Sequence, residues 1–301
     1  MKIGVTFPQA DIGTDPGAIR AFAQAAEDLG FDHITVYDHL LGADPQAKVS
    51  GWHYFYDYTD QFHEPMVLFG FLAAVTQRIE LSTGIIIVTQ RQTVLVAKQA
   101  AEVDVLTGGR LRLGIGIGGN ESEHEALGED FHNRGKRCEE QIEVMRALWT
   151  QDVVTFEGRW HTIKGGGINP RPVQQPIPLW IGGHADAVLK RTARLADGWN
   201  TYLTPDENVE ETIASLHRHA RDAGRDPAEI GIEARVGLIS TPVYKGRSYA
   251  NPRSPEETAR EVDRWRQLGA THVTLNTMDA GLKTADAHIE AIRRFQEALT
   301  R

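Results

Sequence analysis

Eight alternating strand and helix signals predict that this chain is an α/β protein of the (β/α)8-barrel (TIM-barrel) class. Short apolar strands are each followed by an amphipathic helix from the first residues to the last. The 301 residues suit a single barrel, and no break in composition marks a linker. Eight such units favour closure of a parallel sheet, so we expect one domain over residues 1–301.

The first four units are apolar runs separated by turn and capping residues. Residues 3–7 form an apolar strand, and the next helix carries apolar side chains at steps of three and four. Asp15 and Pro16 suit a helix N-cap and first position, and Gly30 suits the end of that helix. The same pattern predicts strands at 33–37, 79–88 and 111–117 and helices at 65–76, 93–106 and 135–149.

The second half of the chain continues this alternation without a visible sequence repeat. Apolar runs bounded by Gly, Pro and Asp predict strands at 178–181, 199–203, 230–239 and 272–276. Stretches of helical periodicity predict helices at 185–195, 205–223, 255–268 and 285–299.

The charge of the chain argues against two classes of partner. Lys and Arg number 32 and Asp and Glu 41, so the net charge is −9. Without basic runs, such a chain is a poor candidate for binding nucleic acid or a membrane surface, and we expect a small-molecule substrate. A site for an anionic ligand must then be built locally, from backbone N–H groups and a few basic side chains.

Cysteine use and the N-terminal residues predict a cytoplasmic protein. Cys138 is the single cysteine, so no intramolecular disulfide can form, which suits a reducing compartment. We assign it a packing role and no catalytic one. The first ten residues resemble a strand rather than a signal peptide, and no stretch reaches the roughly 18 apolar residues of a membrane span.

Three connections are longer than turns between barrel elements need to be: 40–64, 151–177 and 240–254. Such loops in a compact domain are usually lids or binding loops. The first is aromatic and could cover a planar cofactor at the barrel mouth, although a satellite core or a subunit contact explains it equally well. Its aromatic residues are Trp52, Tyr54, Phe55, Tyr56, Tyr58 and Phe62.

Asp38 and His39 end the second strand, where barrel enzymes place catalytic groups. A histidine can give or take a proton near neutral pH, and Asp38 could orient it or cap the loop. A lone histidine more commonly only bonds a loop carbonyl, but its position at a strand end favours a catalytic role.

Glycine-rich ends of the fourth and fifth strands predict a site for a phosphate-bearing ligand. Glycines let backbone amides approach a phosphate closely, although they also serve tight turns. The fifth strand leads into a helix whose N-terminus presents free N–H groups. The residues concerned are Gly116, Gly118, Gly119 and Asn120 after the fourth strand and Gly182 and Gly183 after the fifth.

Other patterns offer less. Gly84 interrupts the third strand, which indicates a bulge or a close approach to a ligand. His217 and His219 are two residues apart on a helix and do not share a face, so we expect no metal site there. The chain has no HExxH, GxSxG or cysteine cluster, so zinc hydrolase and triad hydrolase chemistry have no support.

These residues occur in stretches that resemble the luciferase-like monooxygenase superfamily, and within it the F420-dependent oxidoreductases. The similarity runs from Met1 to about Asp226, and more loosely to the C-terminus. The matching stretches are, in order, AAEDLGFDHITVYDH, LSTGIIIVTQRQTVLVAKQAAEVDVLTGGRLRLGIGIG, NESEHEALGEDFHNRGKRCEEQIEVMRALW and PLWIGGHADAVLKRTARLADGW.

The resemblance implies roles for the residues already named. His39, preceded by Asp38, matches the family's histidine near the reactive ring edge. Gly84 and Ile85 match a bulge with a non-prolyl cis peptide that backs the deazaflavin. The strand-four group matches the region that holds the cofactor's ribityl chain and phosphate, and the strand-five pair matches a second phosphate contact. Gly119 departs from the many relatives that have Trp at this place, which leaves the pocket width there open.

The activity that the resemblance implies is hydride transfer between C5 of F420 and a small organic substrate, with His39 as the acid or base. It also implies a homodimer. Lys245, Arg247 and Tyr249 in the third long loop could meet the anionic tail or the substrate, although a solvated loop is the simpler explanation.

Two alternatives stay open on the same barrel. One is a flavin monooxygenase that uses reduced FMN and O2, and the other is a catalytically silent flavin-binding protein. The substrate cannot be deduced from the sequence, because its pocket would be formed by the three long loops.

Overall fold

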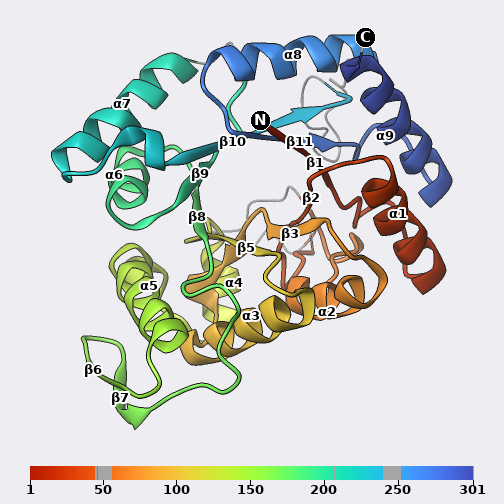
Figure 1. The fold of residues 1–301 in the computed structure, drawn as a ribbon. Coiled ribbons are helices and arrows are strands. Elements are labelled where there is room, and N and C mark those ends of the chain that lie inside the picture. Colours follow the sequence, from red (N-terminus) through yellow and green to blue (C-terminus); the bar gives the residue numbers. More distant parts are fainter. Residues whose placement is uncertain (45, 47–55, 206–207, 240–251, 301) are drawn as a thin grey trace.

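A closed barrel of parallel strands surrounded by helices forms the body of the protein (Figure 1). The computed structural model describes residues 1–44, 46, 56–205, 208–239 and 252–300. Neighbouring strands follow the order β3-β2-β1-β11-β10-β9-β8-β5, and β3 also pairs with β5, which closes the sheet. The predicted (β/α)8 fold is therefore confirmed.

All eight predicted strands are present, with shifted ends. The barrel strands are β1 Lys2–Thr6, β2 His33–Val36, β3 Glu80–Thr83 with its continuation β4 Ile86–Ile87, β5 Leu111–Gly116, β8 Leu179–Gly182, β9 Gly198–Asn200, β10 Gly231–Gly237 and β11 His272–Asn276. The third predicted strand is thus divided in two at Gly84 and Ile85. β4 still pairs with β5, so the barrel wall continues beyond the break.

The predicted helices are also present. They are α1 Pro16–Asp28, α2 Pro65–Val75, α3 Thr93–Thr107, α5 Arg134–Thr150, α6 Asp186–Leu195, α7 Val209–Asp222, α8 Pro255–Gln267 and α9 Ala285–Leu299. Asp15 caps α1 as expected, because its carboxylate accepts hydrogen bonds from the N–H groups of Gly17 and Ala18. The start of α7 was predicted too early, since the helix begins at Val209 and not at 205.

Two elements were not predicted. The connection 151–177 contains an antiparallel hairpin, β6 Val154–Glu157 with β7 Thr162–Gly166, which projects below α3 and α5 in Figure 1. A short helix, α4 Glu121–Ala126, follows β5. Its sequence, ESEHEA, has no apolar stripe, so periodicity gave no signal. Three short 3-10 turns, η1 Val88–Gln90, η2 Phe131–Asn133 and η3 Pro227–Glu229, complete the described elements.

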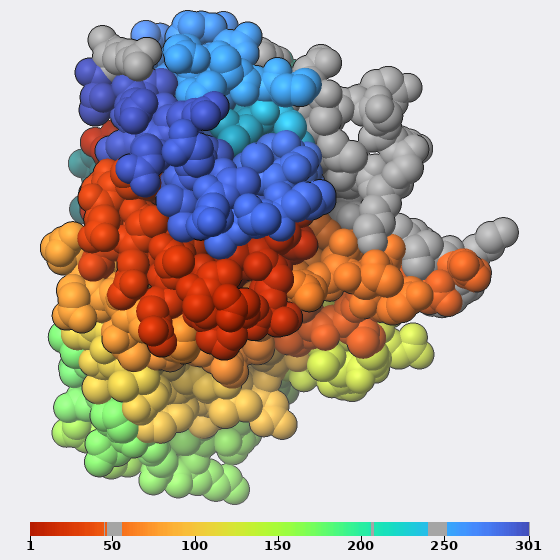
Figure 2. Space-filling model, turned by 90° about the vertical axis from the view of Figure 1, so that its right-hand side faces the viewer, coloured from red at the N-terminus to blue at the C-terminus, as the bar shows by residue number. Residues whose placement is uncertain are grey.

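Helices α9, α1, α2 and α3 lie next to one another in that order on one side of the barrel (Figure 2). The N-terminal and C-terminal helices are therefore neighbours, and the first and last strands, β1 and β11, are paired beneath them. Among the described residues, no helix combines the length and apolar character that crossing a bilayer requires.

The apolar strand residues face outwards. Alternate positions such as Ile34, Val36, Leu113 and Ile115 are buried against the helices in one hydrophobic core. The other positions point into the barrel, and near its N-terminal end these are polar. Many TIM barrels instead fill this space with branched aliphatic side chains.

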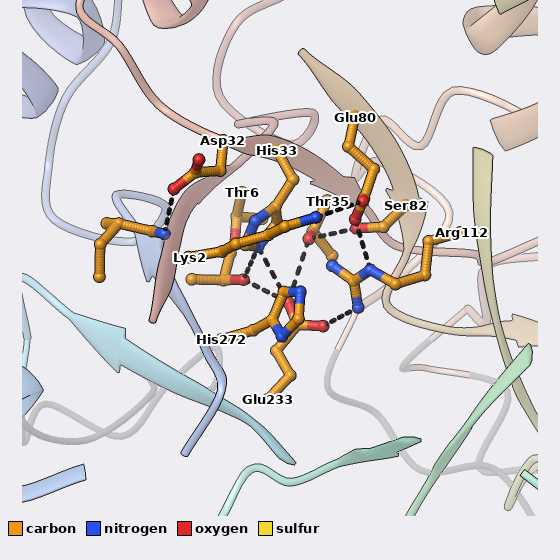
Figure 3. Close-up of polar contacts among 12 residues, drawn as sticks. Lys2, Thr6, Asp32, His33, Thr35, Glu80, Ser82, Arg112, Glu233 and His272 are labelled. Atoms are coloured by element: carbon orange, nitrogen blue, oxygen red, sulfur yellow. Dashed lines mark hydrogen bonds and ion pairs between the residues drawn. The ribbon is translucent and has the colours of Figure 1, made fainter. Parts of the chain in front are cut away.

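A network of charges crosses the N-terminal end of the barrel (Figure 3). The Glu233 carboxylate accepts hydrogen bonds from Arg112 and Thr274, and its Oε1 lies 3.2 Å from His33 Nε2. The Nε of Arg112 donates to Glu80 at 2.6 Å. Burial works against the charge on Glu233, but Arg112 and His33 outweigh it and hold the Glu233 pKa well below its ordinary range. This network forms a buried polar floor at the N-terminal end of the barrel.

Candidate functional site

The wall of the candidate site begins at the break between β3 and β4, where the Gly84–Ile85 peptide bond is cis. The non-prolyl cis bond that the family resemblance implied at this position is thus confirmed. The side chain of Ile85 lies across the ends of two neighbouring strands. A Cβ on Gly116 would collide with Ile85 Cδ1, and a Cβ on Gly182 would lie 2.9 Å from Ile85 Cγ2. These two glycines therefore make room for Ile85.

A cavity of about 460 Å³ opens above Ile85 at the C-terminal ends of the strands. We call it the ring cavity. Its volume is within the usual range for small-molecule and cofactor sites. All predicted glycines line it. The residues around it are Gly84, Ile85, Ile87, Gly116, Ile117, Gly118, Gly119, Gly182, Gly183, His184, Ala185, Val188, Asn200, Thr201, Tyr202 and Arg235.

One end of the ring cavity has the features of an anion site. Gly118 and Gly183 have φ values of 67° and 117°, a backbone conformation that favours glycine. Ala185 precedes α6 without giving it a side-chain cap, so the first N–H groups of that helix are available. Arg134 adds a positive charge nearby, since its Nε donates to the Gly118 carbonyl at 3.3 Å.

His39 lies in a second pocket of about 280 Å³, which we call the histidine pocket. Its imidazole packs against the rings of Tyr56 and Phe62 at centroid distances of 5.1 and 4.7 Å. Burial lowers the His39 pKa below its ordinary value, although the negative charges of Glu123, Asp38 and Asp60 oppose the shift. The ring is therefore neutral at pH 7. A neutral imidazole can accept a proton from a substrate.

Asn120 lines the histidine pocket and not the ring cavity. The resemblance had grouped it with Gly116, Gly118 and Gly119 around the cofactor tail. The chain turns at Gly118 and enters α4 immediately after Asn120, so consecutive residues 119 and 120 face different pockets. Gly119 of the ring cavity and Asn120 of the histidine pocket are thus consecutive in the chain, and Asn120 lines the same pocket as His39.

Asp38 has a positioning role. One carboxylate oxygen accepts a hydrogen bond from Arg91 Nη2 at 2.8 Å, and the other accepts from the Ile87 N–H at 2.9 Å. Burial raises the Asp38 pKa, with Arg91 opposing the rise. Of the two roles that the sequence left open, this geometry favours anchoring of the chain over orientation of His39. Asp38 ties the end of β2 to β4 and so fixes both walls of the site.

Part of the aromatic loop can be placed. Tyr56 and Phe62 pack on His39, while Tyr58 is 68% exposed at the pocket rim. Trp52, Tyr54 and Phe55 lie outside the described residues, as do Lys245, Arg247 and Tyr249. The cofactor-covering role of the loop therefore stays a prediction, while its inner residues shape the histidine pocket.

Sequence reasoning missed the polar residues on β9 and β10. Asn200, Thr201 and Arg235 line the ring cavity. A signal was present in the stretch EARVG, where Glu233 and Arg235 alternate with apolar residues in a strand. Such alternation places both charges on one face of the strand, here the inside of the barrel.

A closed barrel with a glycine-lined cavity at the C-terminal ends of its strands defines a candidate small-molecule site. The family model for luciferase-like monooxygenase matches residues 1–248. The chain therefore belongs to the luciferase-like monooxygenase family.

Curated relatives match most of the chain. An uncharacterized protein of Mycobacterium tuberculosis is 36% identical over 239 residues, which cover 77% of this chain and 82% of that protein. The F420-dependent glucose-6-phosphate dehydrogenase of Kineococcus radiotolerans is 32% identical over 237 residues, which cover 75% of this chain and 66% of that enzyme.

Solved structures share the fold along its whole length. An F420-dependent secondary alcohol dehydrogenase in complex with an F420-acetone adduct has a TM-score of 0.78 at 20% identity, covering 99% of this chain and 98% of its own. A monooxygenase from Streptomyces bottropensis has a TM-score of 0.80 at 22% identity, covering 100% and 99%. At such identities the likeness shows a common fold and nothing finer.

Proposed function

We propose that this protein is an F420-dependent oxidoreductase acting on a small organic substrate. The proposal depends on one arrangement. Ile85 packs over Gly116 and Gly182 beneath a cavity, and this cavity reaches the N-terminus of α6, which has no side-chain cap. Two curated relatives, 32% and 29% identical, are named F420-dependent glucose-6-phosphate dehydrogenases, which supports F420 over FMN. When bound, F420 would supply hydride transfer at its deazaflavin C5.

The residues of the ring cavity would hold and orient this cofactor. Ile85 would support one face of the ring, since its side chain forms the wall between β5 and β8. Gly118, Gly119 and Gly183 would bring main-chain amides to the phosphate tail, together with the first N–H groups of α6. A neutral or acidic surface elsewhere on the chain does not prevent this, because the helix N-terminus supplies its own positive potential.

His39 would handle the proton that accompanies the transfer. Its lowered pKa keeps it neutral at pH 7, so it is suited to accept a proton from a substrate hydroxyl or amine. Asn120 and Tyr56 line the same pocket and would orient the substrate. Asp38 would act indirectly, because its hydrogen bonds fix the end of the strand that carries His39.

A homodimer is the second part of the proposal. Helices α2 and α3 are apolar on several sides, including the outer one, where Val67 is 73%, Leu95 51% and Leu106 53% exposed. Helices that are apolar all round are normally buried. The two helices are neighbours on the face shown in Figure 2, so a second copy that covered them would bury one continuous surface.

Side-by-side titrations of the purified protein with oxidised F420 and with FMN test the cofactor. We expect saturable binding of F420 and much weaker binding of FMN. Gly183→Ala should weaken F420 binding, since the new side chain would be strained at φ 117° and stand at the cavity wall. The matched control is Gly224→Ala, which is also a glycine of positive φ but lies outside the cavity. Tight FMN binding without F420 binding would favour the flavin monooxygenase instead.

A further inference from the structure

Arg235 stands at the deep end of the ring cavity. Beneath that cavity lies a small void of about 20 Å³, which has room for a single water molecule. Four residues line both spaces and so mark the deep end: Gly84, Asn200, Thr201 and Arg235. Of these, only Arg235 carries a charge, which is permanent at any physiological pH.

The charge of Arg235 has no anionic partner in the part of the chain that the structure describes. Its guanidinium lies over the Tyr37 ring, 4.5 Å from the centroid, and makes no ion pair or hydrogen bond with the described residues. Arg112, inside the barrel near its N-terminal end, is different, because it pairs with both Glu80 and Glu233. No Asp or Glu lines the ring cavity, and Glu233, which lines the small void together with Arg235, is already paired with Arg112. A half-buried cation without a counter-charge favours a ligand that brings negative charge to it.

A second polar group at the same end lacks a partner. The Oδ1 atom of Asn200 is buried and accepts no hydrogen bond from the described residues. Its amide extends past β8 towards β5, because a Cβ on Gly114 would lie 2.8 Å from Asn200 Nδ2. The deep end of the cavity therefore offers a guanidinium and a carboxamide together. This combination suits the alternating carbonyl and N–H groups of a pyrimidine edge.

We propose that Arg235 binds the edge of the cofactor ring that becomes negatively charged on reduction, so that the protein holds the reduced cofactor more tightly than the oxidised one. The inference rests on the proposed function. Two electrons and one proton added to the ring leave it with one more negative charge, on the heteroatoms of its pyrimidine edge. A fixed positive charge in a site of low dielectric favours that state.

The placement of Arg235 favours the ring over the substrate as its ligand. Arg235 lies with the cis-peptide residue Gly84 at the bottom of the ring cavity. It does not line the histidine pocket, where the substrate is expected. Arg235 is also remote from the anion-binding end of the ring cavity. Gly118, Gly119 and His184, which mark that end, do not line the small void beneath the cavity. A substrate carboxylate or a phosphate tail therefore lies elsewhere.

Anaerobic titrations with oxidised and reduced F420 test this inference. In the Arg235→Met variant, the dissociation constant for reduced F420 should rise at least tenfold more than the dissociation constant for oxidised F420. The midpoint potential of the bound cofactor should fall by about 30 mV for each tenfold difference. Arg235→Lys should keep most of the preference, because it keeps the charge, and it also guards against a folding defect in the first variant.

Arg134→Met is the matched control. Arg134 also stacks on an aromatic ring, Phe131, but it lies at the Gly118 end of the cavity. Its loss should weaken both redox forms equally, because the tail charge does not change on reduction. Equal weakening of the two forms in Arg235→Met, or a larger loss for the oxidised form, would overturn the inference. A failure of the unmodified protein to bind either form would instead overturn the proposed function.

Discussion

Ile85 occupies the space that a side chain on Gly116 would need. A Cβ built on Gly116, the last residue of β5, collides with Ile85 Cδ1, although Ile85 lies between β3 and β4. Gly182, on the other neighbouring strand end, has the same relation to Ile85. The glycine-rich strand ends thus serve two purposes: Gly116 and Gly182 seat Ile85, while Gly118 and Gly183 shape the anion-binding end.

Gly116→Ala should therefore push Ile85 into the ring cavity. The colliding atom is the far end of a side chain, so we expect rotation of Ile85 and a retained fold. Overpacking of this kind costs about 1–3 kcal/mol, which corresponds to roughly 5-fold to 160-fold in cofactor affinity if the cost falls on the bound state. Equilibrium binding of F420 measures it. The double variant Gly116→Ala, Ile85→Val removes the colliding Cδ1 and keeps most of the side chain beneath the cavity, so it should recover affinity relative to Gly116→Ala. An absence of recovery would contradict the seating role.

His39→Ala should separate binding from chemistry. His39 lines the histidine pocket and not the ring cavity, so F420 affinity should change little. Turnover should fall by about 10²–10⁴, the usual contribution of a positioned acid or base. Any substrate found by screening alcohols and amines with F420 serves for the assay. Unchanged turnover would remove His39 from the mechanism.

The pKa of His39 can be measured directly. Burial lowers it below 6.5, against the opposing charges of Glu123, Asp38 and Asp60. A lowered pKa means that the ring stays neutral as the pH falls through 6.5 and becomes charged only at lower pH. The NMR signals of His39 should therefore titrate below pH 6.5, and the acid limb of kcat/KM should follow them. Asp60→Asn should lower the pKa further, because it removes a charge that favours the imidazolium. A midpoint above 6.5 would contradict this picture.

The sequence predicted the barrel because its outward-facing positions are regular. Residues such as Ile34, Val36 and Leu113 alternate with polar or small residues, and the helices between strands have clear stripes. The bulge at Gly84 was also predicted, from an interrupted strand and a family resemblance. Features that depend on pairs distant in sequence were not. Asp38 accepts hydrogen bonds from Arg91 and Ile87, which are 53 and 49 residues away in the sequence, and no local pattern predicts such a contact.

Arg235 illustrates the remaining limit. Its strand was predicted, but a charged residue in a strand normally indicates a solvent-exposed position. Only a barrel with a polar interior would suggest otherwise. Only the closed structure places Arg235 beside Gly84 and Asn200. Asn120 is a similar case, because whether residue 119 or 120 faces the cofactor depends on the turn into α4. Type and order of elements could thus be predicted, while the side-chain partners needed tertiary structure.

The apolar surface of α2 and α3 gives a prediction on assembly. Leu95→Glu or Leu106→Glu would place a charge in the proposed subunit interface. Sedimentation should report a dimer for the unmodified protein and monomers for these variants. Glu210→Lys on α7 is the control, since that exposed residue lies on another side of the barrel (Figure 1). A dimer that survives both leucine substitutions would place the interface elsewhere.

The last prediction concerns the polar floor of the barrel, the network of Arg112, Glu80, Glu233 and His33. Arg112 is almost fully buried between Glu80 and Glu233, so Arg112→Met would remove a counter-charge from both carboxylates and leave Glu80 with Lys2 and Glu233 with His33. Removing one partner of a buried ion pair costs about 3–5 kcal/mol, which urea unfolding at pH 7 can measure. The control Arg266→Met breaks an exposed pair with Asp263 and should cost less than about 0.5 kcal/mol.

The sign of the pH dependence follows from Glu233. Its folded pKa lies well below the ordinary 4.5, so its carboxylate binds protons more readily in the unfolded chain. The stability that it contributes is therefore complete above pH 4.5 and is lost as the pH falls through the folded pKa. Arg112→Met should raise that folded pKa and so flatten the acid side of the stability curve. An unfolding free energy with the same acid slope in both proteins would show that Arg112 does not hold the charge of Glu233.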